Sequence, residues 1–213
     1  MRIALFGASG KVGAILVPRL RDAGHDVTAV ERGDEPELAG HDAAIDFTGP
    51  DAVRANAERA LGAGLPTIVG TTGLGENDVA ALDALARERS VPCLVVPNFA
   101  LGAVLMMRFA AEAARALPRA EIVELHNERK VDAPSGTAKA TAAAMGGDVA
   151  IHSVRLPGLV AHQEVLLAGD GELLTIRHDT LSREAFVPGV LHALDRLGEL
   201  PPGVTVGLDA VLD

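Results

Sequence analysis

The chain has 213 residues, of which 48% are apolar, and its 29 acidic residues against 19 lysines and arginines give a net charge of −10. This apolar fraction excludes a disordered chain, and the length suits one large or two small domains. The negative charge argues against nucleic acid or an anionic membrane as a partner, so we expect neither to bind.

A single cysteine, Cys93, lies in the apolar run VPCLVVP and cannot form an internal disulfide. We predict a buried structural thiol rather than a reactive nucleophile, because nothing nearby in the sequence would lower its pKa. No secretory signal precedes the first strand, and no apolar run approaches the ~20 residues of a membrane span. We therefore expect a cytoplasmic protein without a membrane partner, and we predict no metal site.

The chain begins with an apolar strand at residues 2–6, followed by a glycine-rich turn and a helical pattern that Gly24 ends. A second strand at residues 26–31 completes a β-α-β unit. The turn has the spacing G-x-x-G-x-x-G and lies where a dinucleotide fingerprint must lie. Its glycines would permit the tight turn, the approach of a pyrophosphate and close helix packing. The predicted cofactor-binding residues of this turn are Gly7, Ala8, Ser9, Gly10, Lys11, Val12 and Gly13.

The second strand ends in an acidic residue that is followed by a basic one. Glu31 lies where a carboxylate binds the ribose hydroxyls of a dinucleotide, whereas Arg32 and Lys11 could pair with the 2′-phosphate of NADP. These opposite preferences predict binding of NADH or NADPH and leave the choice open. The alternative is a purely structural glycine-rich turn, but the flanking strand, helix and Glu31 together favour nucleotide binding.

Strands and helices continue to alternate through residue 96, which is typical of a doubly wound parallel sheet. The predicted strands are residues 43–46, 66–69 and 92–96, and the predicted helices are residues 50–62 and 76–88. In such sheets ligands bind beyond the carboxyl ends of the strands, so the glycine turn, loop 70–73 and loop 97–99 should converge on one crevice. Ordinary turn chemistry explains Thr71, Thr72 and Asn98 equally well, and both interpretations stay open.

The second half of the chain predicts a different kind of sheet. After an Ala-rich helix at residues 100–117, residues 121–126 alternate as a half-buried strand, with Val123 and Leu125 on one side. The other side, which we predict to be open and polar, carries Ile122, Glu124 and His126. A histidine can carry a proton near neutral pH, although a lone histidine is more often a structural hydrogen-bonding group.

Residues 124–138, which read ELHNERKVDAPSGTA, combine a proton donor, fixed cations and a helix start. Arg129 and Lys130 supply positive charge, and Ser135 precedes a helix predicted at residues 136–145. N–H groups at a helix start lack intrahelical partners and favour carboxylates or phosphates, so we expect an anionic substrate here. The competing interpretation is an N-cap serine and a solvated charged turn.

Three further strands are predicted at residues 151–155, 159–167 and 172–179, with a turn at residues 169–171. With residues 121–126 they make a mixed or antiparallel four-stranded sheet. A helix at residues 184–197 follows, and the tail 204–212 should pack back on the first domain. We therefore predict an α/β protein with a Rossmann-type, doubly wound parallel sheet and a second, α+β domain. The dinucleotide-binding domain would be residues 1–99 joined by residues 190–213, and the substrate-binding and oligomerisation domain would be residues 100–189.

Laid out in this way, the chain resembles the dihydrodipicolinate reductase family over nearly its whole length. The most specific match is the run KVDAPSGTA from Lys130 to Ala138, with His126 before it. Further matching pieces are the glycine turn, Glu31-Arg32, Asp46-Phe47-Thr48, Gly70-Thr71-Thr72-Gly73, Asn98-Phe99, Ser153-Val154-Arg155 and Ser182-Arg183 with Phe186. The resemblance implies reduction of 4-hydroxy-tetrahydrodipicolinate to tetrahydrodipicolinate with NADH or NADPH, in lysine and diaminopimelate biosynthesis. It also implies a homotetramer.

The resemblance implies that His126 and Lys130 are the catalytic pair. His126 would be the general acid, because a histidine pKa lies near working pH, and Lys130 would stabilise negative charge. The implied substrate-binding residues, which would hold a small dicarboxylate, are Asn127, Lys130, Ser135, Gly136 and Thr137. The implied cofactor site adds Phe47, Thr48, Gly70, Thr71, Thr72, Pro97, Asn98 and Phe99 to the glycine turn, Glu31 and Arg32.

Three departures from the family pattern mark where this chain differs. Asn127 stands where the family has a second histidine, and an amide can donate a hydrogen bond to a carboxylate but adds no charge. The segment between Ala138 and Ser153 is shortened, and residues 161–163 replace a glycine, an acidic residue and a histidine. Two alternatives therefore stay open, a divergent reductase of another small cyclic or imine carboxylate and a catalytically silent NAD(P)-binding module. Retention of His126 and Lys130 argues against the silent module.

Overall fold

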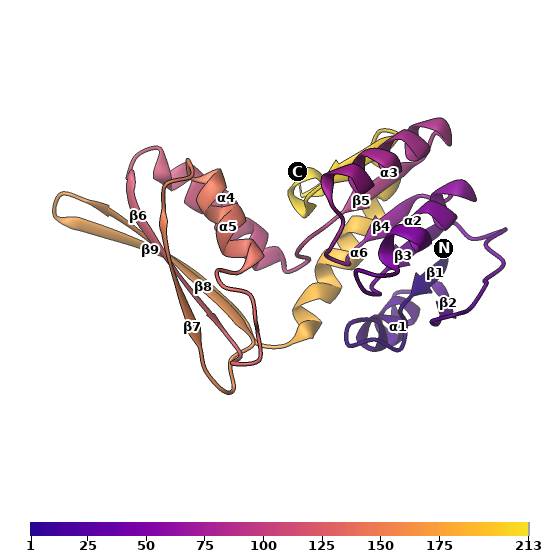
Figure 1. The fold of residues 1–213 in the computed structure, drawn as a ribbon, viewed down its shortest axis with the longest axis horizontal. Coiled ribbons are helices and arrows are strands. Elements are labelled where there is room, and N and C mark those ends of the chain that lie inside the picture. The colour runs from indigo at the N-terminus through magenta and orange to yellow at the C-terminus, as the bar shows by residue number, and fades with distance from the viewer. Residues whose placement is uncertain (213) are drawn as a thin grey trace. The chain divides into compact units, whose positions relative to one another are not determined.

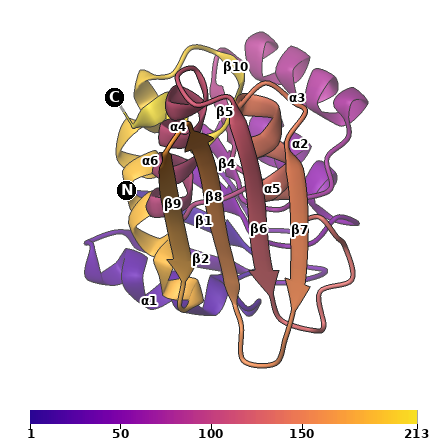
Figure 2. The same ribbon diagram turned by 90° about the vertical axis from the view of Figure 1, so that its left-hand side faces the viewer.

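A computed structural model describes residues 1–212 and divides the chain into two compact units (Figures 1 and 2). Unit 1 combines residues 1–99 with the segment from Phe186 onward, and unit 2 comprises Ala100–Ala185. The sequence placed the return to the first unit at residue 190, four residues later than the structure does. Residue 213, the last of the predicted return segment, lies outside the described residues. No helix within residues 1–212 is long and apolar enough to cross a membrane.

Unit 1 is a six-stranded parallel sheet with helices, the doubly wound arrangement that the alternation predicted (Figure 1). Its strands are β1 (Arg2–Phe6), β2 (Asp26–Val30), β3 (Ala43–Asp46), β4 (Thr67–Val69), β5 (Pro92–Val95) and β10 (Gly203–Val206). Its helices are α1 (Gly13–Asp22), α2 (Val53–Gly62), α3 (Glu76–Glu88) and α6 (Val187–Arg196), with short 3₁₀ helices at Leu197–Glu199 and Leu208–Val211.

The strand order is β10-β5-β4-β3-β1-β2, so the direction of winding reverses between β1 and β3. The loop after β1 and the loop after β3 leave the sheet at this reversal. Open α/β sheets bind ligands at such a switch point, beyond the carboxyl ends of the strands. The topology therefore places the predicted glycine turn and the Phe47-Thr48 loop at the favoured position for a ligand.

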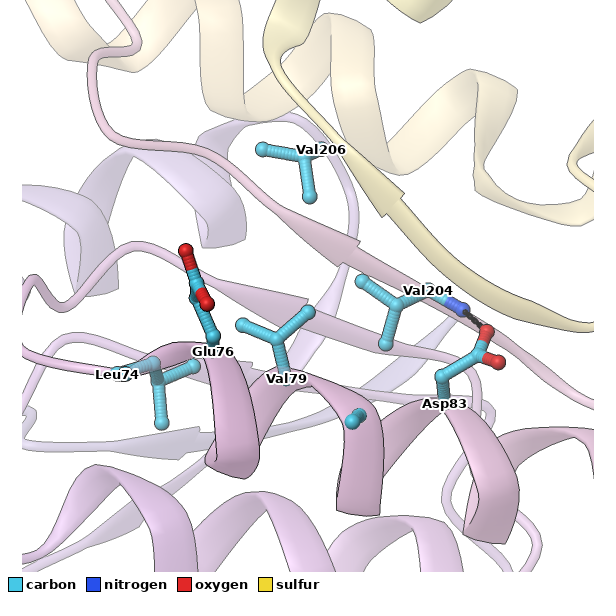
Figure 3. Close-up of a pocket in the computed structure, with 8 residues that line it drawn as sticks. Leu74, Glu76, Val79, Asp83, Val204 and Val206 are labelled. Atoms are coloured by element: carbon cyan, nitrogen blue, oxygen red, sulfur yellow. Dashed lines mark hydrogen bonds between the residues drawn. The ribbon is translucent and has the colours of Figure 1, made fainter.

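Strand β10 confirms that the tail packs back on the first unit, because it pairs in parallel with β5 at the edge of the sheet. As Figure 3 shows, the backbone N–H of Val204 donates to Asp83 Oδ1 of α3, at 2.7 Å. Gly203 has φ +113°, and a Cβ there would lie 2.6 Å from the same oxygen. A glycine is therefore required where this edge strand meets α3.

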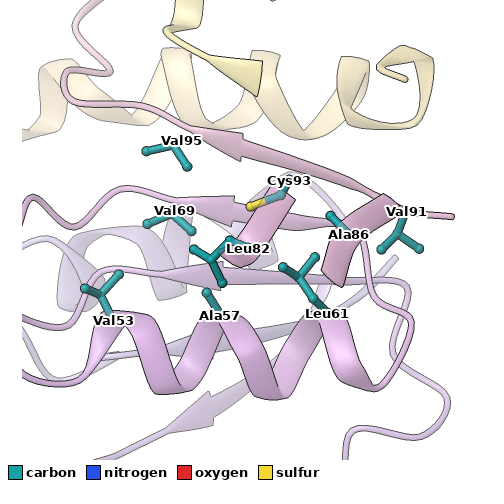
Figure 4. Close-up of a cluster of buried hydrophobic side chains, with 9 residues drawn as sticks. All are labelled: Val53, Ala57, Leu61, Val69, Leu82, Ala86, Val91, Cys93 and Val95. Carbon is teal, nitrogen blue, oxygen red and sulfur yellow. The ribbon is translucent and has the colours of Figure 1, made fainter. Parts of the chain in front are cut away.

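An apolar core lies between the sheet and helices α2 and α3 (Figure 4). Its buried residues are Val53, Ala57, Leu61, Val69, Leu82, Ala86, Val91, Cys93 and Val95. Cys93 is fully buried, and this burial raises the pKa of its thiol to about 12. The prediction of a structural rather than a reactive cysteine is confirmed, since the thiolate is strongly disfavoured.

Unit 2 is a mixed four-stranded sheet with two helices. The strands are β6 (Arg119–His126), β7 (Ala150–Arg155), β8 (Ala161–Gly169) and β9 (Glu172–Thr180), in the order β7-β6-β8-β9, and only β6 and β7 run parallel. Helices α4 (Leu101–Ala114) and α5 (Gly136–Ala144) pack on one face, behind the strands in Figure 2. A short 3₁₀ helix, Arg183–Phe186, follows β9.

The predicted orientation of β6 is wrong. Ile122 and Glu124 are fully buried on the face that α4 and α5 cover, whereas Val123 and Leu125 are only half-buried on the opposite face. An acidic side chain in an alternating strand ordinarily marks the solvent face, and Glu124 is an exception because it has buried partners. His126 shares this covered face with Glu124, so it does not lie on the open side of the sheet.

Some element boundaries differ from the predicted ones. Helix α2 begins at Val53 rather than residue 50, because the carbonyl of Gly49 accepts the N–H groups of Ala52 and Val53 in a preceding turn. Strand β8 begins at residue 161 rather than 159, after a turn in which Gly158 has φ +82°. In both places a glycine-containing turn precedes the helix or strand, which therefore begins later in the sequence than predicted.

Candidate active site

The glycine turn after β1 has the steric properties that a dinucleotide site needs. Gly7 has φ +80°, and a Cβ there would lie 2.6 Å from the carbonyl oxygen of Phe47. A Cβ on Gly13 would lie 2.1 Å from the carbonyl oxygen of Gly7, so α1 packs closely on the turn. Two of the three glycine roles are therefore confirmed, the tight turn and the close helix packing. The role of Gly10 toward a pyrophosphate stays a prediction.

Two phenylalanines lie at the carboxyl edge of the sheet beside this turn. The rings of Phe47, after β3, and Phe99, after β5, have centroids 5.3 Å apart. A Cβ on Gly70, after β4, would lie 2.3 Å from the Phe47 ring, so a larger residue there would displace that ring. The structure thus brings together Gly7, Phe47, Gly70 and Phe99 from four separate loops, which are the three that were predicted to converge and the loop after β3.

A buried carboxyl group lies under these loops and was not predicted as a site residue. Asp46, at the end of β3, is 1% exposed and accepts from the backbone N–H and the hydroxyl of Thr48, at 3.0 and 2.9 Å. It also accepts from the hydroxyl of Thr71 at 2.6 Å and from the amide of Asn56 at 2.8 Å. Both threonines are predicted cofactor residues. In the structure their hydroxyls bind Asp46 and thereby hold their own loops in place. An acidic residue ending a buried strand was the signal in the sequence.

Among the remaining predicted cofactor residues Ala8 is buried and Gly10 and Val12 are half-buried, and most of the others are exposed. The hydroxyl of Ser9 donates to the carboxylate of Glu31, which fixes the acidic side chain beside the glycine turn at the end of β2. The backbone N–H of Glu31 donates to Asp34 at 2.8 Å. Lys11 and Arg32 are exposed, as are Thr72 and Pro97, whereas Asn98 is half-buried. The structure therefore fixes the position of the Glu31 carboxylate, and its role toward ribose hydroxyls stays a prediction.

In unit 2 an ion pair between the buried Glu124 and the half-buried Arg155 lies beside His126. Glu124 is fully buried, and its two carboxylate oxygens accept from the guanidinium of Arg155 at 2.7 and 2.8 Å. The Nδ1 atom of His126 lies 2.5 Å from Glu124 Oε2, and the backbone N–H of Ser135 donates to Oε1 at 3.2 Å. The sequence indicated His126 but missed Glu124 and Arg155 as site residues. The match of Ser153-Val154-Arg155 to the family was the available signal.

The electrostatics of this cluster follow from burial and from its hydrogen bonds. Burial alone would raise the pKa of Glu124, but hydrogen bonds from Arg155, Ser153 and His126 lower it to about 2. Burial lowers the pKa of His126, which the carboxylate of Glu124 opposes. Glu124 is therefore ionised at neutral pH, and His126 carries its proton less firmly than an exposed histidine does.

The loop after β6 is folded by its own side chains. Lys130 Nζ pairs with both carboxylate oxygens of Asp132, at 2.7 and 2.8 Å, and Asn127 Oδ1 accepts from the backbone N–H of Arg129 at 3.1 Å. The ion pair with Asp132 was not predicted. A substrate carboxylate that binds Lys130 must share the ammonium group with Asp132 or replace it.

Helix α5 begins as predicted, with Ser135 as its N-cap. The hydroxyl of Ser135 accepts from the backbone N–H of Ala138 at 3.2 Å, and the residue is 3% exposed. Its side chain therefore has the structural role that was the alternative interpretation. Gly136 is exposed, and a Cβ there would meet nothing within 4 Å, while Thr137 is half-buried. The first turn of α5 thus presents Gly136 and Thr137 next to the cluster around Glu124.

A separate groove of about 470 Å³ lies between α3 and β10 (Figure 3). Its lining is Leu74, Gly75, Glu76, Val79, Ala80, Asp83, Val204 and Val206. None of the predicted site residues lines it, so it is not the site that the sequence indicated.

A Rossmann-type sheet with a glycine turn, joined to a unit that sets a histidine beside a helix start, is typical of nicotinamide-dependent oxidoreductases. Residues 25–99 match the family "Dihydrodipicolinate reductase, N-terminus", and residues 102–212 match "Dihydrodipicolinate reductase, C-terminus". The chain belongs to the dihydrodipicolinate reductase family.

Individual relatives agree with this assignment. The 4-hydroxy-tetrahydrodipicolinate reductase of Beutenbergia cavernae is 44% identical over 245 residues, covering 100% of this chain and 99% of the relative. That of Cutibacterium acnes is 42% identical over 247 residues, covering 100% and 98%. Since the first span of 245 positions exceeds the 213 residues of this chain, at least 32 positions have no residue here. The chain is therefore shorter than these relatives.

Solved structures show the same fold. The dipicolinate-bound dihydrodipicolinate reductase from Paenisporosarcina sp. TG-14 has a TM-score of 0.86 and 30% identity, and the match covers 100% of this chain and 99% of that one. A probable dehydrogenase from Thermotoga maritima, with a TM-score of 0.72, 11% identity and coverage of 98% and 92%, shares the fold alone.

Proposed function

We propose that this chain reduces 4-hydroxy-tetrahydrodipicolinate to tetrahydrodipicolinate with NADH or NADPH, in lysine and diaminopimelate biosynthesis, with the 4-hydroxyl group leaving as water. The observation that carries the proposal is the cluster of His126, Glu124 and Arg155 at the start of α5, in a chain of this family. Relatives with this activity cover the whole chain, and a structural neighbour was solved with dipicolinate, a planar analogue of such a substrate.

Unit 1 would hold the cofactor at the switch point between β1 and β3. The residues present fit a dinucleotide, because any Cβ on Gly7, Gly13 or Gly70 would collide with neighbouring atoms while the glycines leave the turn open. Ser9, Gly10 and Lys11 would lie along the pyrophosphate, and Glu31 would accept from ribose hydroxyls. When bound, the cofactor supplies a hydride. Phe47, Thr48, Thr72 and Asn98 would shape the nicotinamide end.

Unit 2 would bind the substrate through its two carboxylates. The start of α5 offers backbone N–H groups at Gly136 and Thr137, Lys130 adds a positive charge, and Asn127 adds an amide donor. His126 would donate the proton that completes the reduction, because a histidine can carry a proton near neutral pH and Glu124 opposes the lowering of its pKa by burial.

The decisive measurement couples the purified chain to dihydrodipicolinate synthase and follows oxidation of NADH and NADPH separately. We expect oxidation that depends on the synthase, and we expect His126→Gln to lower kcat by about 10²-fold or more while leaving the Kd for NADH within about twofold. Nucleotide binding without oxidation of either cofactor would contradict the proposed reaction. An unchanged kcat for His126→Gln would remove that residue from the mechanism.

We further propose that the chain is a homo-oligomer, a tetramer by resemblance to its family, and that it works in the cytoplasm. The face of the unit 2 sheet opposite α4 and α5 supports self-association, since Val123 and Leu125 are only half-buried there. A sheet face with apolar side chains needs a covering layer. Leu125→Arg should shift the mass measured by sedimentation toward that of the monomer, and an unchanged mass would contradict this choice of interface.

A further inference from the structure

The ion pair of the buried Glu124 and the half-buried Arg155 joins three separate parts of the substrate unit. Through its carboxylate, Glu124 contacts His126 at the end of β6 and the backbone N–H of Ser135 at the start of α5. Through its guanidinium, Arg155 on β7 donates to both oxygens of Glu124 and to the backbone carbonyl of Asp132, at 2.8 Å. One ion pair therefore contacts the histidine, the loop and the helix start together.

The donor and acceptor roles in this cluster are fixed by chemistry. An ionised carboxylate can only accept, and Arg155 and the backbone N–H of Ser135 can only donate, so Glu124 stays an acceptor throughout. The close contact between Glu124 Oε2 and His126 Nδ1 therefore requires a hydrogen on Nδ1. In the neutral imidazole the remaining nitrogen, Nε2, is then the acceptor, and in the imidazolium it carries the transferable proton.

We propose that Glu124, held by Arg155, is a positioning residue that keeps the hydrogen of His126 on Nδ1 and so assigns proton transfer to Nε2. This inference rests on the proposed function, because it concerns the proton that completes the reduction. Since Glu124 is fully buried, its contact with His126 is not exchanged for water. His126 thus has a fixed ring orientation and a single reactive nitrogen.

The charges that face His126 show why Glu124 cannot be replaced by another neighbour. Glu124 raises the pKa of His126 and so favours the protonated ring. Burial, Lys130 and Arg155 lower the pKa of His126 and favour the neutral ring. In the loop, Asp132 pairs with Lys130. Without Glu124, His126 would face two cations and would be a weaker source of protons at neutral pH.

The sharpest test is Glu124→Gln, because glutamine has nearly the same shape. With its amide oxygen in the place of Oε1, it can still accept from Arg155 Nη2 and from the backbone N–H of Ser135. Its NH₂ group, in the place of Oε2, would lose the hydrogen bond from Arg155 Nη1 and point at His126 Nδ1, which must accept. We expect the hydrogen of His126 to move from Nδ1 to Nε2. Histidine-selective ¹⁵N NMR distinguishes the two tautomers, and among the seven histidines the missing signal in His126→Gln assigns the one of interest.

The kinetic expectation for Glu124→Gln is a fall in kcat of about tenfold or more, with the Kd for dipicolinate within about threefold of wild type. The pH limb of kcat that reports the acid should move to lower pH. Glu58→Gln is the matched control, since Glu58 pairs with Arg54 at 3.0 Å on the surface of α2 and should change none of these values. Glu124→Asp, which keeps a carboxylate, should keep the wild-type tautomer and recover part of kcat.

A wild-type His126 that carries its hydrogen on Nε2 would overturn the inference, and so would Glu124→Gln with a wild-type tautomer or a wild-type kcat. If Glu124→Gln does not fold, the wild-type tautomer and the Glu124→Asp variant decide the matter. The NMR measurement needs no turnover. Absence of activity in the wild-type chain would therefore contradict the proposed function while the tautomer still tests the role of Glu124.

Discussion

Replacing Asp46 by alanine tests whether this buried carboxylate holds the loops of Thr48 and Thr71 in place through its hydrogen bonds. The substitution removes the acceptor of four donor groups, which are the backbone N–H and hydroxyl of Thr48, the amide of Asn56 and the hydroxyl of Thr71. A lost hydrogen bond costs about 1 kcal/mol when water can reach the donor, as it can at these half-buried groups. We therefore expect a loss of about 4 kcal/mol in the free energy of unfolding of unit 1.

For a chain of this size, 1 kcal/mol shifts Tm by about 2–4 °C, so Asp46→Ala should lower Tm by about 8–16 °C. Circular dichroism during heating measures this shift, and fluorescence titration should show weaker NADH binding because both threonine loops lose their anchor. Asp51→Ala, an exposed aspartate in the following loop, is the matched control and should change Tm little. A Tm for Asp46→Ala within about 2 °C of wild type would refute the assignment of this network.

Two further predictions concern the glycine turn and the buried carboxylate. Gly13→Ala places a Cβ 2.1 Å from the carbonyl oxygen of Gly7, so α1 must shift, and NADH binding measured by titration should be lost. In the control Gly62→Ala the added Cβ meets nothing within 4 Å, and this variant should bind NADH normally. Glu124, whose pKa is lowered from 4.5 to about 2, should contribute about 3 kcal/mol of stability above about pH 4.5 that disappears as the pH falls toward 2. Urea unfolding across this range should show that loss in wild type and a flatter profile in Glu124→Gln, and identical profiles would contradict the depressed pKa.

The fold of unit 1 was predictable because its signals are local. Each buried strand is a short apolar run that ends in a turn residue, and each helix has a regular apolar period, so neighbouring residues suffice to place them. Strand β10 was harder. Its residues 203–206 carry little pattern, and only pairing with β5, more than a hundred residues earlier, makes them a strand.

The candidate site was predictable where the role of a residue depends only on its residue type and on its neighbours in the sequence. The glycine turn, His126 and the start of α5 are of this kind, since glycine geometry, histidine protonation and capping by Ser135 follow from local sequence. Glu124 was misplaced because its burial depends on Arg155, which lies 31 positions away on another strand. An ion pair between two distant strands does not alter the pattern of apolar and polar residues in either strand. A buried charge therefore looks like an exposed one in the sequence alone.

The position of β10 at the edge of the first sheet also constrains how the chain can fold during synthesis. The first sheet lacks its edge strand until residue 206 has been made, although its other five strands are complete by residue 95. At about 5–20 residues per second the ribosome needs about 5–20 s to cover that interval. During this time β5 has an unpaired edge, the kind of surface that templates aggregation. Unit 2, whose residues are contiguous, can fold within the same interval, so the unit that begins second is able to finish first.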